Sequence, residues 1–139
     1  MKLAVVSAIL SSCMCLPVAH ATQFSWQPQV HDGYNFKAGS YVPISGNAHV
    51  EAYNDTEKPH TYSYMLGVYT DCGANVNNTG TYSTTITILP GDRFKEDRTI
   101  AGTAKCNNYG THKVTLTVGF ADNSGSAYYQ QQFGFIHAV

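Results

Sequence analysis

The chain has 139 residues and a formal net charge of −1 at pH 7, and only 12% of its residues are charged. That charged fraction is about half of the roughly 25% that is usual in soluble domains. The near-neutral balance argues against nucleic acid as a partner and gives no basic patch for a membrane surface, because both need clustered Lys and Arg.

The first twenty-one residues have the pattern of a cleaved bacterial secretory signal. Lys2 supplies the positive start, Leu3 to Leu16 is largely apolar, and Ala19-His20-Ala21 offers the small residues that a signal peptidase recognises. The apolar run is too short to span a membrane. We therefore expect residues 1–21 to be removed and the protein to be periplasmic or secreted.

A lipid anchor remains an alternative for this segment. Leu10-Ser11-Ser12-Cys13 fits the short box that precedes a lipidated cysteine, and Cys13 would then carry the anchor. The apolar residues Met14 to Ala21 argue against it, since a polar tether is usual after such a cysteine.

The mature chain lacks a sustained helical pattern, and apolar and polar residues alternate instead. The polar segment 22–33 is expected to form an N-terminal arm. Seven short strands are then predicted, separated by Gly, Pro, Asn and Asp, at residues 34–44, 48–53, 60–70, 82–88, 94–104, 112–120 and 129–137. In the closing strand, Tyr129, Gln131, Phe133, Phe135 and His137 alternate along one side, and Tyr128 is expected opposite the core face.

Two cysteines, Cys72 and Cys106, remain once the signal is removed, and such a pair in an exported domain forms a disulfide. Seven strands separated by turns predict a sandwich of two antiparallel sheets, in which the third and sixth strands are neighbours. Cys72 follows the third strand and Cys106 precedes the sixth. The expected topology therefore brings both cysteines to one end of the sandwich.

Three segments resemble bacterial immunoglobulin-like and fibronectin-III-like modules of cell-surface proteins: His49 to Asn54, Ile88 to Gly91 and Gly110 to Val118. The resemblance covers roughly residues 34 to 139. It implies an immunoglobulin-like fold and a binding role, although the two cysteines are not at the inter-sheet positions of antibody-type domains. With the strand pattern and the cysteine pair, the expected fold is all-β, a seven-stranded antiparallel immunoglobulin-like β-sandwich with one disulfide. It carries over no functional residue, and the buried Trp of antibody domains is absent from the third strand.

Catalytic and metal-binding patterns are missing from the sequence. The mature chain has five histidines, none at zinc-site spacing: His31, His49, His60, His112 and His137. His112 and His137 are expected on or near the sheet surface. The mixed charges from Asp92 to Arg98 are expected to be a solvated face, and no nucleophile motif is present. No catalytic residue, metal site or cofactor is predicted.

Aromatic side chains and turns are the candidates for binding. Alternation places Tyr53, Tyr69 and Tyr128 opposite the expected core faces, where exposed Tyr can serve as an interface anchor or stack on sugars. Tyr is also common in strands for packing reasons alone. Two turns are expected together at the end opposite the disulfide, with candidate binding residues Asn54, Asp55, Lys58, Asp122 and Asn123.

The sequence therefore predicts a non-enzymatic module that binds a protein or glycan outside the cytoplasm. One alternative is a structural or assembly subunit that pairs through an edge strand, with the arm exchanged between copies and Trp26 as its anchor. Another is a small secreted hydrolase whose residues converge only in three dimensions. Ligand identity and oligomeric state stay open at this level.

Overall fold

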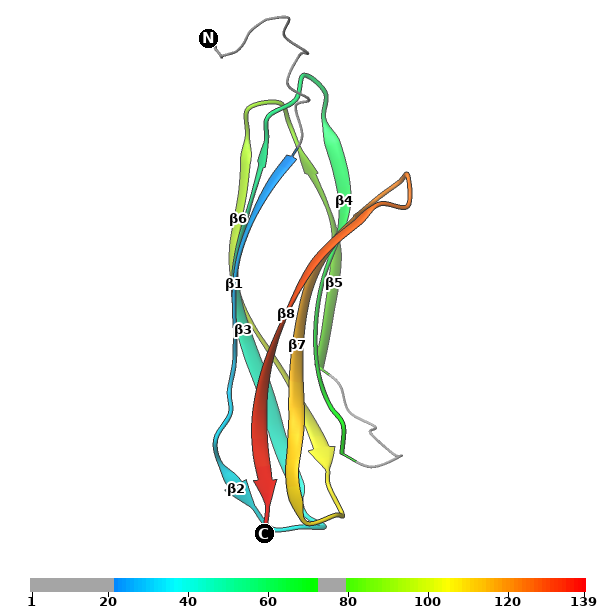
Figure 1. Ribbon diagram of the computed structural model, residues 1–139. Coiled ribbons are helices and arrows are strands. Elements are labelled where there is room, and N and C mark those ends of the chain that lie inside the picture. Colours follow the sequence, from blue (N-terminus) through cyan, green and yellow to red (C-terminus); the bar gives the residue numbers. More distant parts are fainter. Residues whose placement is uncertain (1–21, 73–79) are drawn as a thin grey trace, which may run out of the picture.

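The computed structural model describes residues 22–72 and 80–139, and its regular structure is entirely β-strand. The described residues form eight strands, β1 (Thr22–Val30), β2 (Asn35–Phe36), β3 (Tyr41–Asn54), β4 (His60–Thr70), β5 (Gly80–Ile88), β6 (Arg93–Lys105), β7 (Gly110–Asp122) and β8 (Ala127–Ala138). They run along an elongated sandwich (Figure 1). The predicted signal and Cys13 lie outside the described residues. Within the described ranges, no helix is long and apolar enough to cross a membrane.

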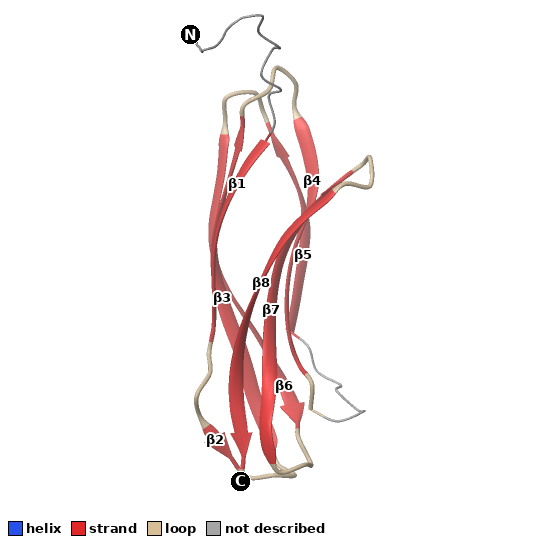
Figure 2. Ribbon diagram, viewed as in Figure 1, coloured by secondary structure: helices blue, strands red, loops and turns tan. Residues whose placement is uncertain are grey.

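The strands form two sheets, of order β1-β3-β6 and β2-β8-β7-β4-β5 (Figure 2). All pairings are antiparallel except the short β2–β8 contact, which is parallel. β1, β3 and β6 take the places of strands A, B and E of an immunoglobulin-like sandwich, and β4, β7 and β8 take those of C, F and G. The expected all-β immunoglobulin-like fold is confirmed, including the contact between the strands predicted as third and sixth.

The core lies between the sheets, where alternate residues of each strand point inward. Tyr64 of β4 and Phe120 of β7 are the largest fully buried side chains, and their rings stack at 5.0 Å. Around them lie aliphatic residues from both sheets: Val42, Ile44, Val50, Val68, Val114, Leu116, Val118 and Ile136. Each such side chain contributes about 1.5–3 kcal/mol when it leaves water. The alternation predicted for β4 and β7 is confirmed by this burial.

The N-terminal part of the prediction needs correction. The expected arm is mostly β1, which pairs with β3 over nine residues from Thr22↔Asn54 to Val30↔Gly46. The expected strands 34–44 and 48–53 are replaced by one long strand, β3, because Gly46 lies inside that strand and marks no turn. A Cβ at Gly46 would lie 2.9 Å from a methyl of Leu116, so any side chain there would force Leu116 to shift.

The closing strand has the opposite orientation from the one expected. Tyr129, Phe133 and Phe135 face solvent, whereas Gly134 and Ile136 face the core. Gly134 is inward because a Cβ there would lie 2.5 Å from Val30 and Asp32, so this position admits no side chain. A shift of one residue moves every side chain of a strand to the other face. The aromatic side of β8 is therefore an outer surface.

The predicted disulfide is present between Cys72, just after β4, and Cys106, just after β6, with their Cα atoms 4.7 Å apart. Both sulfurs are buried at the end of the sandwich where β6 passes into β7. Because β4 and β6 belong to different sheets, the bridge ties the two sheets together. It closes a loop with a sequence separation of 34 residues.

Candidate functional site

The outer faces of the two sheets differ in chemistry. We call the outer side of β4, β7 and β8 the aromatic face, and it includes Met65, Gly67, Tyr69, Lys113, Thr117, Gly119, Tyr129, Gln131, Phe133 and Phe135. We call the outer side of β1, β3 and β6 the polar face, and it centres on Gln27, Gln29, Asn47, His49, Asp97 and Thr99. The aromatic face is the stronger candidate for binding.

Strand register brings the residues of the aromatic face together in rows. The first row is Met65, Gly119 and Tyr129, the second is Gly67, Thr117 and Gln131, and the third is Tyr69, Thr115 and Phe133. Large side chains thus stand on β4 and β8, while β7 between them carries small residues. The face is hollowed along its middle for this reason.

Large apolar side chains on this face are open to solvent. Tyr129 is 67% exposed, and Phe133 and Phe135 are each 46% exposed. Two adjoining hollows of about 510 and 330 Å³ share Met65, Thr117 and Gln131 in their walls. Exposed apolar side chains beside such hollows are common at interaction sites, because folding alone gains nothing from their exposure.

Gln131 on the aromatic face contacts two neighbouring hydroxyl groups. The Gln131 amide donates to the Thr117 hydroxyl at 3.2 Å and lies 3.5 Å from the Tyr69 hydroxyl. The Lys113 ammonium lies 4.7 Å from the centre of the Phe133 ring, within range of a cation–π interaction. A ligand on this face therefore meets mainly apolar groups.

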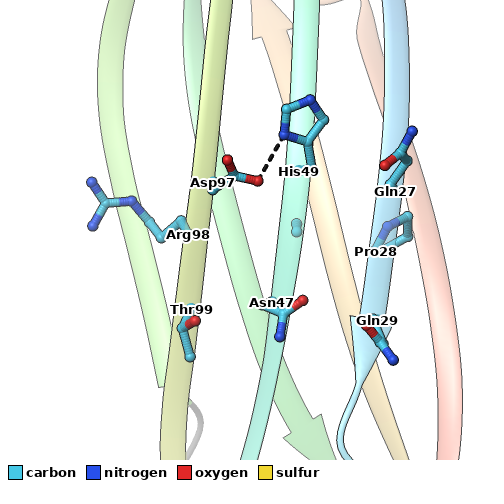
Figure 3. A pocket seen from close by; sticks show the side chains of 9 residues that line it. Gln27, Pro28, Gln29, Asn47, His49, Asp97, Arg98 and Thr99 are labelled. Carbon is cyan, nitrogen blue, oxygen red and sulfur yellow. Dashed lines mark hydrogen bonds and ion pairs between the residues drawn. The ribbon is translucent and has the colours of Figure 1, made fainter.

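The polar face has a shallow hollow of about 490 Å³, with one row formed by Gln27, His49 and Asp97 (Figure 3). His49 is held between two carboxylates: its Nδ1 lies 2.7 Å from Asp97, and its Nε2 lies 2.9 Å from Glu51. These hydrogen bonds, first that of Glu51 and then that of Asp97, raise the pKa of His49 above its usual value. In turn His49 lowers the pKa of Glu51.

The His49 cluster is an acid–base group without a nucleophile. Both ring nitrogens of His49 are occupied by carboxylates, so neither is left to activate a hydroxyl. Elsewhere in the described residues, His60 contacts the Thr56 hydroxyl at 2.9 Å, but that hydroxyl is within hydrogen-bond distance of Asn54 and Lys58. The arrangement of these groups favours structural hydrogen bonding over catalysis.

His112 lies beside the disulfide, contrary to its expected surface position. It is 9% exposed, and its Nε2 lies 2.8 Å from the carbonyl oxygen of Asn108. The sulfurs of Cys72 and Cys106 and one nitrogen of His112 lie within 4.8 Å of one another. Metal ligation needs thiolates. Since the sulfurs are bonded to each other, this group can hold a metal only after reduction.

The three tyrosines predicted to be exposed have different environments. Tyr69 lies on the aromatic face and is 39% exposed. Tyr53 is half-buried on the outer side of β3, with the Arg93 guanidinium 4.9 Å from its ring centre. Tyr128 is opposite buried Phe120 in the register and stacks on Phe24 at 5.0 Å, so it lies on the core side, contrary to expectation. It is 43% exposed because the β7–β8 hairpin projects from the sandwich (Figure 1).

Two of the predicted binding residues in the turns have structural roles. Asn54 is fully buried, and its amide donates to the carbonyl oxygens of Lys58 and Ile88. The Asp122 carboxylate accepts hydrogen bonds from the Ser124 hydroxyl and from the backbone N–H groups of Ser124 and Ser126, and the hydroxyl contact is the largest cause of its lowered pKa. The remaining candidates occupy the same two turns, at the end away from the disulfide: Asp55, Lys58 and Asn123.

Comparison with known proteins gives no family for this chain. No protein-family profile matches it, and no curated protein matches it in sequence. Among solved structures, a protein from Archaeoglobus fulgidus has 7% identity and a TM-score of 0.45, covering 86% of this chain and 98% of its own. A FixG-related protein from Vibrio parahaemolyticus has 10% identity and a TM-score of 0.39, covering 83% and 95%. A PapD-like domain of human CEP192 has 8% identity and a TM-score of 0.35, covering 97% and 96%.

Proposed function

We propose that this protein is an exported, non-enzymatic module that binds another protein through its aromatic face. The observation that carries the proposal is the outward orientation of Tyr129, Phe133 and Phe135 on β8. Burying such side chains against a partner supplies about 25 cal/mol per Å² of apolar surface, which the free protein forgoes. Exposed aromatic residues are also the commonest energetic anchors of protein interfaces.

A protein partner fits this face better than a glycan does. Met65, Phe133 and Phe135 offer no hydrogen-bonding side-chain atoms that a sugar hydroxyl can use, and Gln131 and Thr117 are hydrogen-bonded to each other. Glycan sites need several free polar groups that fix the orientation of the sugar. We therefore infer a partner with an apolar surface of its own and a carboxylate placed near Lys113, the cation on this face.

Site-specific photo-crosslinking in the producing cells tests this function. A photoreactive aromatic amino acid replaces Tyr129 in one strain and Asn47, on the polar face, in a matched strain. We expect a protein adduct from position 129 and none from position 47, and the same partner should lose affinity for the Phe133→Ser variant. Equal adducts from both positions, or adducts only between copies of this chain, contradict the proposal. If the mature protein binds an oligosaccharide on an array and the Phe133→Ser variant does not, the partner is a glycan and the proposal is contradicted.

A further inference from the structure

The open edges of the two sheets differ in how well they are protected against pairing with another strand. At the edge of β6, the outward-facing odd residues include Arg93, Lys95, Asp97 and Lys105, and β1 carries Pro28. Charges and proline on edge strands discourage addition of another strand. By contrast, β5 has neither charge nor proline over its full length from Gly80 to Ile88.

The free hydrogen-bonding groups of β5 can be assigned from the register. The Asp71 N–H donates to the Lys113 carbonyl oxygen, so the backbone groups of the odd-numbered residues of β4 point toward β7. The backbone groups of the even-numbered residues of β4 therefore point toward β5, where they pair with its even-numbered residues. The backbone groups of four residues therefore face outward along the edge: Thr81, Ser83, Thr85 and Thr87. Among the described residues, no backbone hydrogen bond outside the strand ladders involves these four.

The sequence of β5 is complementary to itself. Around Thr84 as centre, Thr81 corresponds to Thr87, Tyr82 to Ile86 and Ser83 to Thr85. An antiparallel pair of β5 strands in this register matches hydroxyl with hydroxyl on the outer side and aromatic with β-branched side chains on the core side. Both kinds of cross-strand pair are favourable. A two-fold interface requires such a surface that matches its own copy.

We propose that two copies of this chain pair through β5 to form a dimer with one continuous ten-stranded sheet. The register uses all four outward-facing residues, and with two hydrogen bonds per hydrogen-bonded pair it forms about eight backbone hydrogen bonds. Thr84 of each copy then lies opposite Thr84 of the other, and Ser83 lies opposite Thr85. The β5 edge is the docking surface, and a second β5 is its occupant.

The size of the contact makes the dimer reversible. Nine residues at about 3.4 Å each and a sandwich about 10 Å deep give a footprint of roughly 300 Å² per copy. Stable interfaces use about 800 Å² per partner, so the dimer is expected to dissociate on dilution. In this register, the odd-numbered residues of both β5 strands lie on the same side of the ten-stranded sheet. The aromatic faces of the two copies therefore lie on the same side of the dimer. If the proposed function holds, a partner with two sites gains avidity from this arrangement.

A second open edge exists in the first half of β8, from Ala127 to Phe133, before the pairing with β2 begins. This segment also lacks charge and proline. It is not complementary to itself, however, because Tyr129 would face Gln131 and Ala127 would face Phe133. The chemistry therefore favours β5 as the site of pairing between copies.

Cysteine crosslinking under mild oxidation tests the dimer and its register without any partner protein. In the mature protein, Thr84→Cys is expected to form an intermolecular disulfide, because facing non-hydrogen-bonded residues have Cα atoms about 4.5 Å apart. Ser83→Cys or Thr85→Cys alone should crosslink poorly, whereas a mixture of the two should give a heterodimer. Equal crosslinking by all variants, or none by any, overturns the proposal.

Charge variants of the same two positions provide a second measurement by sedimentation velocity across a concentration series. Ser83→Lys/Thr85→Lys places like charges opposite each other and should leave only monomer, whereas Ser83→Lys/Thr85→Glu places opposite charges together and should restore the dimer. Gln131→Lys on the β8 edge is the control and should not change the dimer. A monomeric wild-type protein at all concentrations, or a dimer lost only on Gln131→Lys, contradicts pairing through β5. Because no partner is present, these outcomes are independent of the proposed function.

Discussion

The polar face and the aromatic face belong to one sandwich and arise from the same two-residue alternation, yet they expose different chemistry. On β3, His49 and Glu51 alternate with the buried Ala48, Val50 and Ala52. These two polar side chains are hydrogen-bonded to each other and are partly open to solvent. On β8, the residues opposite the core include Phe133 and Phe135. A stable sandwich needs only the first arrangement, because water solvates polar outer surfaces well. The second arrangement is the one on which the proposed function rests.

The edges of the two sheets show a parallel difference. The β6 edge beside the polar face is charged, and the β5 edge beside the aromatic face is lined with Ser and Thr. Apolar surface and unprotected strand edge thus occur on the same sheet. Features that promote association are concentrated in the five-stranded sheet, and the three-stranded sheet carries features that oppose it.

The sharpest test of this contrast compares two phenylalanines on opposite sides of one sheet. Phe120 is 1% exposed and touches Phe24, Tyr64 and Phe94, whereas Phe133 is 46% exposed. Phe120→Ala should lower the free energy of unfolding by about 3–5 kcal/mol, and Phe133→Ala by less than about 1 kcal/mol. Urea unfolding followed by circular dichroism measures both. Equal losses would place Phe133 in the core and remove the basis of the aromatic face.

The disulfide joins the sheets that carry the two faces, and its removal should have the next largest effect. The double variant Cys72→Ser/Cys106→Ser should lose about 4 kcal/mol of stability, since the bridge restricts the unfolded chain over a loop of 34 residues. Guanidinium unfolding of the variant measures this loss, and wild-type protein unfolded in reductant is the matched control. Unchanged stability in both samples would show that the bridge does not form in solution.

How much of this fold could be predicted depends on how sharply each strand's two sides differ. In β7, His112, Val114, Leu116 and Val118 alternate with Lys and Thr, so its core side is evident from the sequence. In β8, both sides of the strand carry apolar residues, with Tyr128 and Ile136 on one side and Phe133 and Phe135 on the other. Alternation cannot choose between such sides. The choice is made by Gly134, whose close approach to Val30 is a contact with the chain's distant N-terminal strand.

The candidate site was only partly predictable for the same reason. Tyr69 was found because its strand has one clear core side, and Tyr129 and Phe133 were missed because β8 was assigned the wrong side. The turn composition predicts Asn54 as a binding residue since turns often bind ligands, but its amide and carbonyl groups complete the turn itself. Local composition identifies a turn, whereas hydrogen bonds across 34 residues, such as that to Ile88, appear only in the folded chain.

Glycines on the aromatic face and in the core offer a test that separates stability from binding. A methyl group at Gly67 would meet nothing closer than 4.0 Å, and one at Gly119 nothing closer than 3.5 Å. Gly67→Ala and Gly119→Ala should therefore keep or raise stability, by up to about 1 kcal/mol, because glycine in a strand costs conformational entropy. The inward-facing Gly46→Ala should instead lose about 1–3 kcal/mol through overpacking against Leu116.

Thermal unfolding measures these glycine effects, and affinity for the photo-crosslinked partner measures the second half of the test. Gly119→Ala narrows the hollow between Met65 and Tyr129, and Gly67→Ala narrows the adjoining hollow, so both should weaken binding while the protein remains as stable as wild type. Loss of stability in Gly67→Ala would show that the strands pack more closely than the register indicates. Unchanged binding in both outer variants would place the partner elsewhere.

The smallest effect is expected on the polar face, where the charge of His49 depends on two carboxylates. Hydrogen bonds to Glu51 and then to Asp97 raise the pKa of His49 above its usual 6.5. A group whose pKa rises on folding stabilises the protein fully below its unfolded value, and the contribution disappears as the pH increases through the folded value. The His49 contacts should therefore stabilise the protein fully below pH 6.5, and this contribution should be lost as the pH rises through the folded pKa of His49, which lies above 6.5.

An NMR titration of the His49 ring checks this, with a midpoint above 6.5 expected for the wild type. Glu51→Gln should lower the midpoint more than Asp97→Asn does, because Glu51 is the larger cause of the shift. Glu57→Gln removes an exposed carboxylate in the β3–β4 turn and should leave the midpoint in place. A midpoint that responds equally to all three substitutions would mean that net charge controls His49. Binding on the aromatic face should be indifferent to all of them, since these carboxylates lie on the opposite outer surface of the sandwich.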